Sequence, residues 1–168
     1  MLHFYYGDGK GKTTAALGLA FRFSGQGKRA VVVQFLKNTD CGEVKVLSDM
    51  DITLLRGKCG DCFTCFMTER QLAETKIIHE DNLKKALSLI KTGDMLILDE
   101  AADAVELNLL DEQLFKQAIL DNKDAVEIVV TGHKPLSWLM ETADYITEMK
   151  KHKHPFDSGI SARKGIEY

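Results

Sequence analysis

Short runs of apolar residues alternate along this chain with longer segments in which apolar residues recur at helical spacing. The short runs predict strands at Leu2–Tyr6, Arg29–Phe35, Asp51–Leu55, Met95–Leu98, Glu127–Thr131 and Tyr145–Thr147. The helical spacing predicts helices at Lys12–Phe23, Thr68–Thr92, Leu110–Asn122 and Pro135–Thr142. The strands are nearly continuous in Val, Ile and Leu, which is typical of a parallel sheet covered by helices on both faces. The pattern therefore predicts a three-layer α/β fold with a mostly parallel sheet.

The alternation continues over the whole sequence, so we expect residues 1–168 to form a single domain. A length of 168 residues is sufficient for one domain with a substantial core. The segment Arg56–Met67 interrupts the pattern and predicts an irregular loop, and the residues after Met149 are basic and turn-like. In parallel α/β folds, ligands bind beyond the carboxyl ends of the strands.

Composition and charge are those of an ordinary globular protein. Hydrophobic residues make up 45% and charged residues 28% of the chain, and the formal net charge is −3. This balance gives no electrostatic reason to expect a nucleic-acid partner. No apolar run is long enough to cross a bilayer, and Met1 leads directly into the first predicted strand. We therefore expect a cytoplasmic enzyme with neither a membrane anchor nor a signal peptide.

A glycine-rich segment joins the first predicted strand to the first predicted helix. It consists of Gly7, Asp8, Gly9, Lys10, Gly11, Lys12, Thr13 and Thr14. Backbone N–H groups in such a turn bind phosphate at a helix N-terminus. We expect Lys12 to contact the phosphates and the Thr13 hydroxyl to bind Mg²⁺.

The spacing of this segment departs from the standard P-loop. A standard P-loop has a glycine where this chain has Tyr6, so the loop is one residue shorter. A glycine-rich turn without a ligand is the alternative interpretation. The Gly-Lys-Thr-Thr sequence at the start of a helix favours a nucleoside triphosphate site in a P-loop (RecA-like) fold.

An acidic pair, Asp99 and Glu100, follows the strand predicted at Met95–Leu98. In P-loop enzymes an acid at such a strand end lies near the metal ion. We therefore expect Asp99 or Glu100 to join Thr13 among the oxygen ligands of Mg²⁺, and both are candidate metal-binding residues. The alternative is a solvated acidic pair at the start of the next helix, where the helix dipole favours negative charge.

Other polar residues follow strands at the same predicted edge of the sheet. Gln34 is near the end of the second predicted strand, Lys37 follows it, and His133 follows the strand Glu127–Thr131. Any loop after a strand can carry such residues by chance. We expect His133 to be a surface histidine and not a general base.

Taken in order, these segments resemble the P-loop ATP:corrinoid adenosyltransferases, also described as cob(I)alamin adenosyltransferases. The resemblance is carried by Gly7–Ala16, Arg22, Gly25, Gly27, Val33–Phe35, Lys37, Gly42–Glu43, Leu98–Glu100, Val130–Gly132, Ala143–Asp144, Thr147–Met149, Lys153–His154, Phe156–Asp157, Gly159 and Gly165–Tyr168. These segments span nearly the whole chain. The shortened P-loop is itself typical of the family, and the C-terminal block is highly specific.

The resemblance implies an unusual reaction of the nucleotide. Such enzymes transfer the 5′-deoxyadenosyl group of ATP to Co(I) of a corrinoid and release the whole triphosphate, in the synthesis or salvage of adenosylcobalamin. It implies ATP contacts along residues 7–14 and catalytic roles for Lys12, Thr13 and Glu100. It also implies cobalamin or a corrinoid precursor as second substrate, an electron-donating reductase as partner, and a homodimer.

The resemblance also indicates where the corrinoid binds. In the family, a Phe-Thr-Trp segment lies against the lower face of the corrinoid, and the matching residues here are Phe63, Thr64 and Cys65. This implies Phe63 and Cys65 as corrinoid-binding residues. The cysteine in place of tryptophan is a departure that bears on how the lower face is packed and on which corrinoid is preferred.

Three cysteines in the same segment have the spacing Cys59-x-x-Cys62-x-x-Cys65, and Cys41 is the other cysteine. The spacing is typical of zinc or iron–sulfur ligands, with Cys41 available as a fourth ligand. Free thiols in a mobile corrinoid loop and a reversible redox disulfide are the alternatives. A permanent disulfide framework is not expected in a cytosolic protein.

Two other functions are consistent with parts of the pattern. A P-loop nucleoside kinase with cysteine-bound zinc would need paired C-x-x-C motifs late in the chain and a full-length P-loop, and this chain has neither. An ATP-gated adenosylcobalamin carrier would share every binding residue with the transferase and differ only in turnover. In the tail, we expect Lys153, His154 and Phe156 to lie near the site or at a dimer contact.

Overall fold

The computed structural model describes residues 1–39, 41–50 and 52–167. Its centre is a parallel sheet with the strand order β3-β2-β4-β5-β1-β6. The strands are β1 (Leu2–Tyr6), β2 (Ala30–Gln34), β3 (Ile52–Arg56), β4 (Met95–Asp99), β5 (Glu127–Gly132) and β6 (Tyr145–Glu148). Because all these neighbours are parallel, the carboxyl ends of the strands lie at one edge of the sheet.

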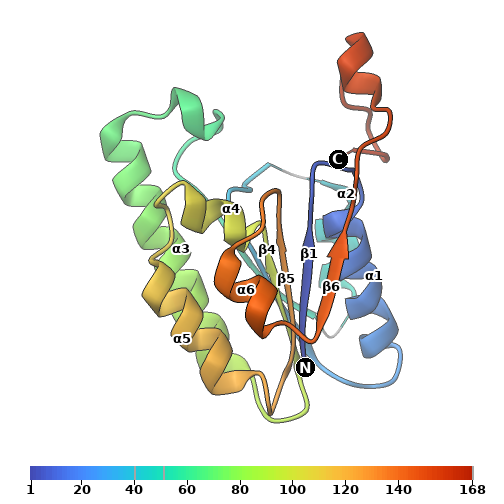
Figure 1. Cartoon of the computed structure of the whole chain (residues 1–168), viewed down its shortest axis with the longest axis vertical. Coiled ribbons are helices and arrows are strands. Elements are labelled where there is room, and N and C mark those ends of the chain that lie inside the picture. The colour runs from blue at the N-terminus through green and yellow to red at the C-terminus, as the bar shows by residue number, and fades with distance from the viewer. Residues whose placement is uncertain (40, 51, 168) are drawn as a thin grey trace.

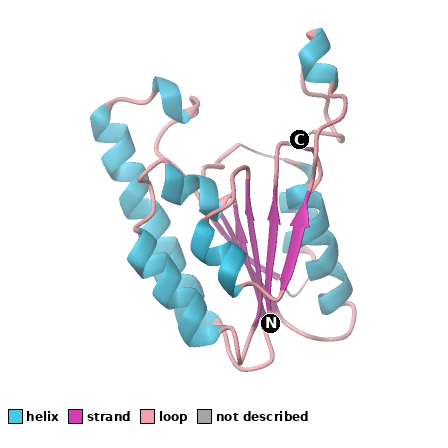
Figure 2. Cartoon of the chain, viewed as in Figure 1, coloured by secondary structure: helices cyan, strands magenta, loops and turns pink. Residues whose placement is uncertain are grey.

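Helices cover both faces of this sheet. They are α1 (Lys12–Ser24), α2 (Gly42–Ser48), α3 (Glu69–Leu89), α4 (Ala101–Glu106), α5 (Glu112–Asn122) and α6 (Ser137–Thr142), with short 3₁₀ turns at Thr64–Phe66 and Pro155–Ser158. Figure 1 shows α1 on one side of the sheet and α3, α5 and α6 on the other. Figure 2 shows the strands as the layer between these helices, which confirms the predicted three-layer α/β fold.

Side chains alternate along each strand and build a hydrophobic core on each face of the sheet. In β4, Leu96 and Leu98 pack into the core formed with α3, α4, α5 and α6, whereas Met95 and Ile97 pack into the core formed with α1 and α2. Burial on both faces explains why this strand is continuously apolar in sequence. Within the described ranges, no helix has the combined length and apolarity that a bilayer span requires.

The structure differs from the predicted elements mainly in short helices and at capped ends. The sequence pattern does not predict α2 or α4, because neither is long enough to show helical periodicity. The predicted helix Thr68–Thr92 begins one residue later, since the Thr68 side chain caps α3 by accepting from Gln71 N. Asp111 caps α5 in the same way. Residue 51 of the predicted strand Asp51–Leu55 lies outside the described residues.

Candidate active site

The glycine-rich segment forms a loop between β1 and α1 that is fixed by two neighbouring strand ends. Gly7 N donates to His133 O at 3.1 Å, and Gly9 N donates to Met149 O at 2.6 Å. Gly7 and Gly11 both have a φ of 115°, in the left-handed region that favours glycine. A Cβ at Gly9 would lie 2.5 Å from Met149 O. The loop therefore requires glycine both for its conformation and for close contact with the chain after β6.

The side chain of Lys12 lies inside this loop. Its Nζ donates to Gly7 O at 2.6 Å and to Gly9 O at 2.9 Å. Burial lowers the pKa of Lys12, and nearby carboxylates, Asp103 foremost, oppose that shift. The Lys12 ammonium is thus held where it would contact a phosphate bound at the N-terminus of α1.

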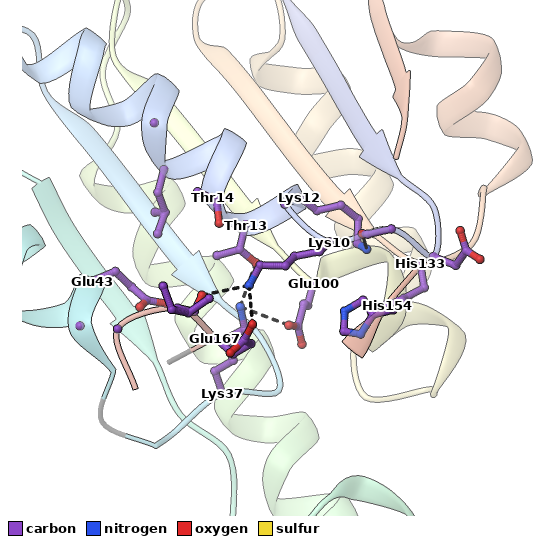
Figure 3. A pocket seen from close by; sticks show the side chains of 18 of the residues that line it. Lys10, Lys12, Thr13, Thr14, Lys37, Glu43, Glu100, His133, His154 and Glu167 are labelled. Carbon is purple, nitrogen blue, oxygen red and sulfur yellow. Dashed lines mark hydrogen bonds and ion pairs between the residues drawn. The ribbon is translucent and has the colours of Figure 1, made fainter. Parts of the chain in front are cut away.

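The C-terminal tail reaches the same loop. Lys10 Nζ donates to Ile166 O at 2.9 Å and forms an ion pair with Glu167 Oε1 at 3.2 Å (Figure 3). Arg163 also binds this carboxylate, and hydrogen bonds from Arg163 lower the pKa of Glu167 to about 2. Among the tail residues expected near the site, His154 lines the adjacent cavity, whereas the side chain of Phe156 is 75% exposed.

Asp99 is fully buried at the end of β4 and is held by three other elements. Thr13 Oγ1 at the start of α1 donates to Asp99 Oδ1 at 2.9 Å, and Thr131 Oγ1 in β5 donates to the same oxygen at 2.8 Å. Gln34 Nε2 in β2 lies 3.4 Å from Asp99 Oδ2. The alternative of a solvated acidic pair is therefore wrong for Asp99.

Lys37 joins Asp99, Glu100 and Thr13 into one group. Its Nζ lies 2.8 Å from Asp99 Oδ2 and 3.0 Å from Thr13 Oγ1. The same Nζ lies 3.2 Å from Glu100 Oε1 (Figure 3). Burial acts to lower the pKa of Lys37, but the two carboxylates outweigh it and raise the pKa above its usual value. Burial likewise raises the pKa of Glu100, and Lys37 opposes that shift.

The turn that directs Lys37 into this group is held by His79, a buried residue that the sequence pattern does not identify as part of the site. Leu36 has a φ of 59°, and its N–H donates to His79 Nε2 at 3.1 Å. His79 Nδ1 lies 3.0 Å from Leu109 O, so the ring proton is on Nδ1. Burial lowers the pKa of His79 to about 4. The sequence does carry a signal that His79 is buried, because it lies four residues before Leu83 and thus on the same buried face of α3.

These groups border a cavity of about 700 Å³ at the carboxyl edge of the sheet (Figure 3). The P-loop residues Asp8, Gly9, Lys10, Gly11, Lys12, Thr13 and Thr14 form one wall. Other walls come from Lys37 with Glu100, from Gly42 and Glu43 of α2, and from the tail. This volume is within the usual range for a small-molecule site. The structure thus brings together at this cavity the residues predicted to bind ATP, except Gly7. Gly7 does not line the cavity and instead anchors the loop through its hydrogen bond to His133 O.

His133 lies between this cavity and a smaller one of about 270 Å³. Its Nδ1 is 3.0 Å from Asp103 Oδ2, and this hydrogen bond raises the pKa of His133. The side chain of His133 is 60% exposed, which confirms it as a surface histidine. Glu100 and His133 line both cavities, so ligands in the two cavities would meet at these residues.

The predicted magnesium residues fit a magnesium ion. Thr13, Asp99 and Glu100 present oxygen atoms, the donors that Mg²⁺ prefers, and these oxygens converge on one cationic atom, Lys37 Nζ. Gln34 Oε1 is buried in the same group and has no hydrogen-bond partner within the described part of the chain. An acceptor in that position is suited to a water molecule bound to a metal ion.

The loop expected to contact the corrinoid presents an apolar surface to solvent. Phe63 is 78% exposed and Phe66 is 74% exposed, on either side of the exposed Cys65. Figure 1 shows this turn beyond the start of α3, at the same end of the molecule as the C-terminal tail. The two exposed rings are therefore accessible to a ligand at this end of the molecule.

The cysteines do not assemble a metal centre among the residues that the structure describes. All four cysteines are free, and no three Cys, His, Asp or Glu side chains in the described ranges are grouped as metal ligands. Cys59 Sγ donates to Glu74 Oε2 at 3.0 Å, which raises the pKa of Cys59. Cys41 Sγ lies 3.6 Å from Arg56 Nη1. The zinc or iron–sulfur interpretation of Cys59, Cys62 and Cys65 thus gains no support from this geometry.

Comparison with known proteins gives matches along nearly the whole chain. The family model described as ATP:corrinoid adenosyltransferase BtuR/CobO/CobP matches residues 1–168. The chain is similar to the corrinoid adenosyltransferase of Escherichia coli (strain K12), with 34% identity over 167 residues, covering 98% of this chain and 83% of the relative. A corrinoid adenosyltransferase of Sinorhizobium sp is 33% identical over 168 residues, covering 96% and 77%. Corrinoid adenosyltransferase CobA of Salmonella typhimurium (strain LT2) is 30% identical over 165 residues, covering 98% and 83%.

Proposed function

Because the chain belongs to the ATP:corrinoid adenosyltransferase family, we propose that it transfers the 5′-deoxyadenosyl group of ATP to the Co(I) of a corrinoid substrate. The observation that carries this proposal is the convergence of the shortened P-loop, Thr13 and Glu100 at one cavity, with the buried Asp99 hydrogen-bonded to Thr13. The product would serve the synthesis or salvage of adenosylcobalamin.

The proposed reaction forms one bond at cobalt and breaks one bond at carbon. The electron pair of Co(I) attacks C5′ of ATP, the C5′–O bond breaks, and its electrons leave with the triphosphate. No proton is transferred, so no side chain is needed as a general base. The protein must instead hold C5′ near cobalt, in line with the leaving triphosphate, and neutralise the charge that develops there.

The P-loop supplies positive charge to the triphosphate. Backbone N–H groups at the start of α1 would bind phosphate oxygens, and Lys12 would exchange the carbonyls of Gly7 and Gly9 for the phosphates. Lys10 would leave Glu167 for the same ligand. The protein cations therefore already lie around the cavity but are paired with weaker partners than a triphosphate.

Thr13, Asp99 and Glu100 would hold Mg²⁺ against this triphosphate. Bound there, the ion neutralises part of the negative charge of the leaving group. Thr131 fixes the orientation of the site, since its hydroxyl accepts from Glu100 N at 2.8 Å while it donates to Asp99. The catalytic roles of Lys12, Thr13 and Glu100 are thus electrostatic.

The corrinoid would lie against the exposed turn that carries Phe63 and Cys65. An apolar contact at the lower face favours a corrinoid without its lower axial ligand, the form that accepts an electron more readily to give Co(I). An electron-donating reductase would supply that electron. We further expect a cytoplasmic homodimer.

A multiple-turnover assay under anaerobic conditions tests the proposed function, with ATP, Mg²⁺ and chemically reduced cobalamin as reactants. We expect light-sensitive adenosylcobalamin in molar excess over the protein. One equivalent of product that stays bound would indicate an ATP-gated carrier. Formation of ADP without a cobalt–carbon bond would indicate a kinase or hydrolase, and would contradict the proposal.

A further inference from the structure

The ammonium of Lys37 occupies the place that the proposed function assigns to Mg²⁺. It lies within 3.2 Å of the oxygen atoms of Thr13, Asp99 and Glu100. A magnesium ion bound to the same oxygens would lie about 2.0–2.1 Å from each. The ion and the ammonium cannot both occupy the centre of this group, so one must leave when the other enters.

The side chain of Lys37 has room to move. It is 22% exposed and lines the nucleotide cavity, so displacement of Nζ would bring it into that cavity without crossing the core. The backbone before it is fixed, because Leu36 N donates to the buried His79. The backbone at Lys37 is therefore held in place, while its flexible four-carbon side chain can change conformation.

The charges around Lys37 make this exchange depend on the nucleotide. Without a nucleotide, the two carboxylates of Asp99 and Glu100 are partly neutralised by one ammonium. A divalent ion entering alone would force this ammonium into a cavity that already holds Lys10 and Lys12. A triphosphate in that cavity would instead give the ammonium new anionic partners.

We propose that Lys37 is an exchangeable counterion that fills the metal site in the nucleotide-free enzyme and yields it to Mg²⁺ only together with a triphosphate. The inference rests on the proposed function, because it takes Thr13, Asp99 and Glu100 as the metal ligands. It makes metal binding and triphosphate binding strongly coupled, so each increases the affinity for the other. After the exchange, the displaced ammonium of Lys37 contacts the triphosphate and is a further cation that stabilises this leaving group.

Gln34 supports this assignment independently of Lys37. Its side chain is fully buried, its Nε2 lies 3.4 Å from Asp99 Oδ2, and its Oε1 has no partner among the described residues. A buried acceptor without a donor is unfavourable, and the Lys37 ammonium does not satisfy it. A hydrated metal ion would supply the missing donor, which suggests that the group is built for such an ion rather than for a permanent salt bridge.

Binding of Mn²⁺ alone to the nucleotide-free protein tests this inference, with electron paramagnetic resonance to measure free Mn²⁺. Mn²⁺ takes the same oxygen ligands as Mg²⁺ and gives a direct spectroscopic signal. We expect weak binding to the wild type and at least tenfold tighter binding to Lys37→Met. Lys37→Arg keeps the charge and should remain weak. Lys28→Met removes a lysine that lies over the ring of Phe23 and does not line the cavity, and should change the affinity less than about twofold.

Thermal unfolding gives a second readout that does not depend on activity. Lys37→Met leaves Asp99 and Glu100 without their ammonium, so it should melt below the wild type and regain stability when Mg²⁺ is added. The wild type should respond little to Mg²⁺ alone. Lys37→Gln replaces the Met variant if the latter does not fold.

Two results would overturn the role of Lys37. One is Mn²⁺ binding by Lys37→Met, or by the Gln variant, that is no tighter than wild-type binding. The other is tight Mn²⁺ binding by the nucleotide-free wild type. Either result, combined with normal magnesium-dependent adenosyl transfer, would remove this inference and leave the proposed function in place. Absence of adenosyl transfer by the wild type would instead contradict the proposed function itself.

Discussion

At the scale of single residues, two lysines of the site differ in their partners and in the direction of their pKa shifts. Lys12 faces the backbone carbonyls of Gly7 and Gly9, and burial lowers its pKa. Lys37 faces two carboxylates, and its pKa is raised although it too is largely buried. The first lysine is therefore paired with neutral carbonyl oxygens, which a phosphate would replace in the proposed reaction, whereas the second is paired with two carboxylates.

Lys12→Ala should lower kcat for adenosyl transfer by about a hundredfold or more, because the leaving triphosphate loses a preorganised cation. Anaerobic steady-state kinetics measure the change, and the melting temperature shows whether the variant is folded. Lys28→Ala is the control, since Lys28 lies over the ring of Phe23 and does not line the cavity. A folded Lys12→Ala variant with near-normal kcat would rule out the proposed phosphate role.

The buried His79 predicts a defined dependence of stability on pH. Its pKa is about 4 in the folded protein and 6.5 in an ordinary environment, so the unfolded chain binds more protons between these values. The stabilisation is complete above pH 6.5 and is lost as the pH falls toward 4. At 1.36 kcal/mol per pH unit, the loss is about 3 kcal/mol.

Urea unfolding between pH 4.5 and 7.5 measures this effect, with His79→Gln as the comparison. A glutamine in this position offers an acceptor for Leu36 N and a donor for Leu109 O without a titratable group. The free energy of unfolding of the variant should therefore fall less steeply toward low pH. Parallel pH profiles for the two proteins would show that His79 is not the group responsible.

At the scale of elements, the sequence pattern predicts the long, strongly patterned segments and fails at the short ones. β4 and α3 are predicted because burial imposes an apolar run on the strand and a buried face on the helix. α4 is missed because Ala101, Ala102 and Ala104 pack as small residues against β5 and give no periodic signal. α2 is missed because, with seven residues, it buries little more than Leu47.

The close contact of the P-loop with the end of β6 predicts different effects for two glycines. Gly9→Ala places a Cβ 2.5 Å from Met149 O, so the loop must shift, and both ATP affinity and stability should fall. Gly18→Ala, in the middle of α1, meets no atom within 4 Å and should raise stability by about 0.5–1 kcal/mol. Urea unfolding of both variants and calorimetric ATP titration of Gly9→Ala measure these changes. Unaltered ATP affinity in Gly9→Ala would mean that the loop tolerates the displacement.

At the scale of the whole molecule, the strand order determines which side chains meet. β4 lies between β2 and β5, and this order brings Lys37, Asp99 and Thr131 together although they are far apart in sequence. The motifs predict Thr13, Asp99 and Glu100, because phosphate and magnesium binding restrict residue types and spacing. The sequence places Lys37 at the same edge of the sheet but does not predict its contacts with Asp99 and Glu100, nor the support by His79, since these depend on the strand order and on the left-handed turn at Leu36.

If the exposed turn before the start of α3 contacts the corrinoid as proposed, Phe63 should affect reduction rather than folding. Phe63→Ala should leave stability nearly unchanged, because the side chain is 78% exposed. It should slow adenosylation that starts from Co(II) more than adenosylation that starts from chemically prepared Co(I). Phe66→Ala, with a side chain 74% exposed on the same turn, provides the comparison. Equal losses from both cobalt states would contradict the contact of Phe63 with the lower face.

In the proposed reaction, bond cleavage occurs at C5′ of ATP, in the cavity between the P-loop and the end of β4. The most direct test measures the phosphate product and the cobalt–carbon bond in the same anaerobic reaction. We expect one intact triphosphate for every adenosylated corrinoid, with both products lost together in Lys12→Ala. Release of ADP and phosphate, or of triphosphate without adenosylated corrinoid, would contradict it.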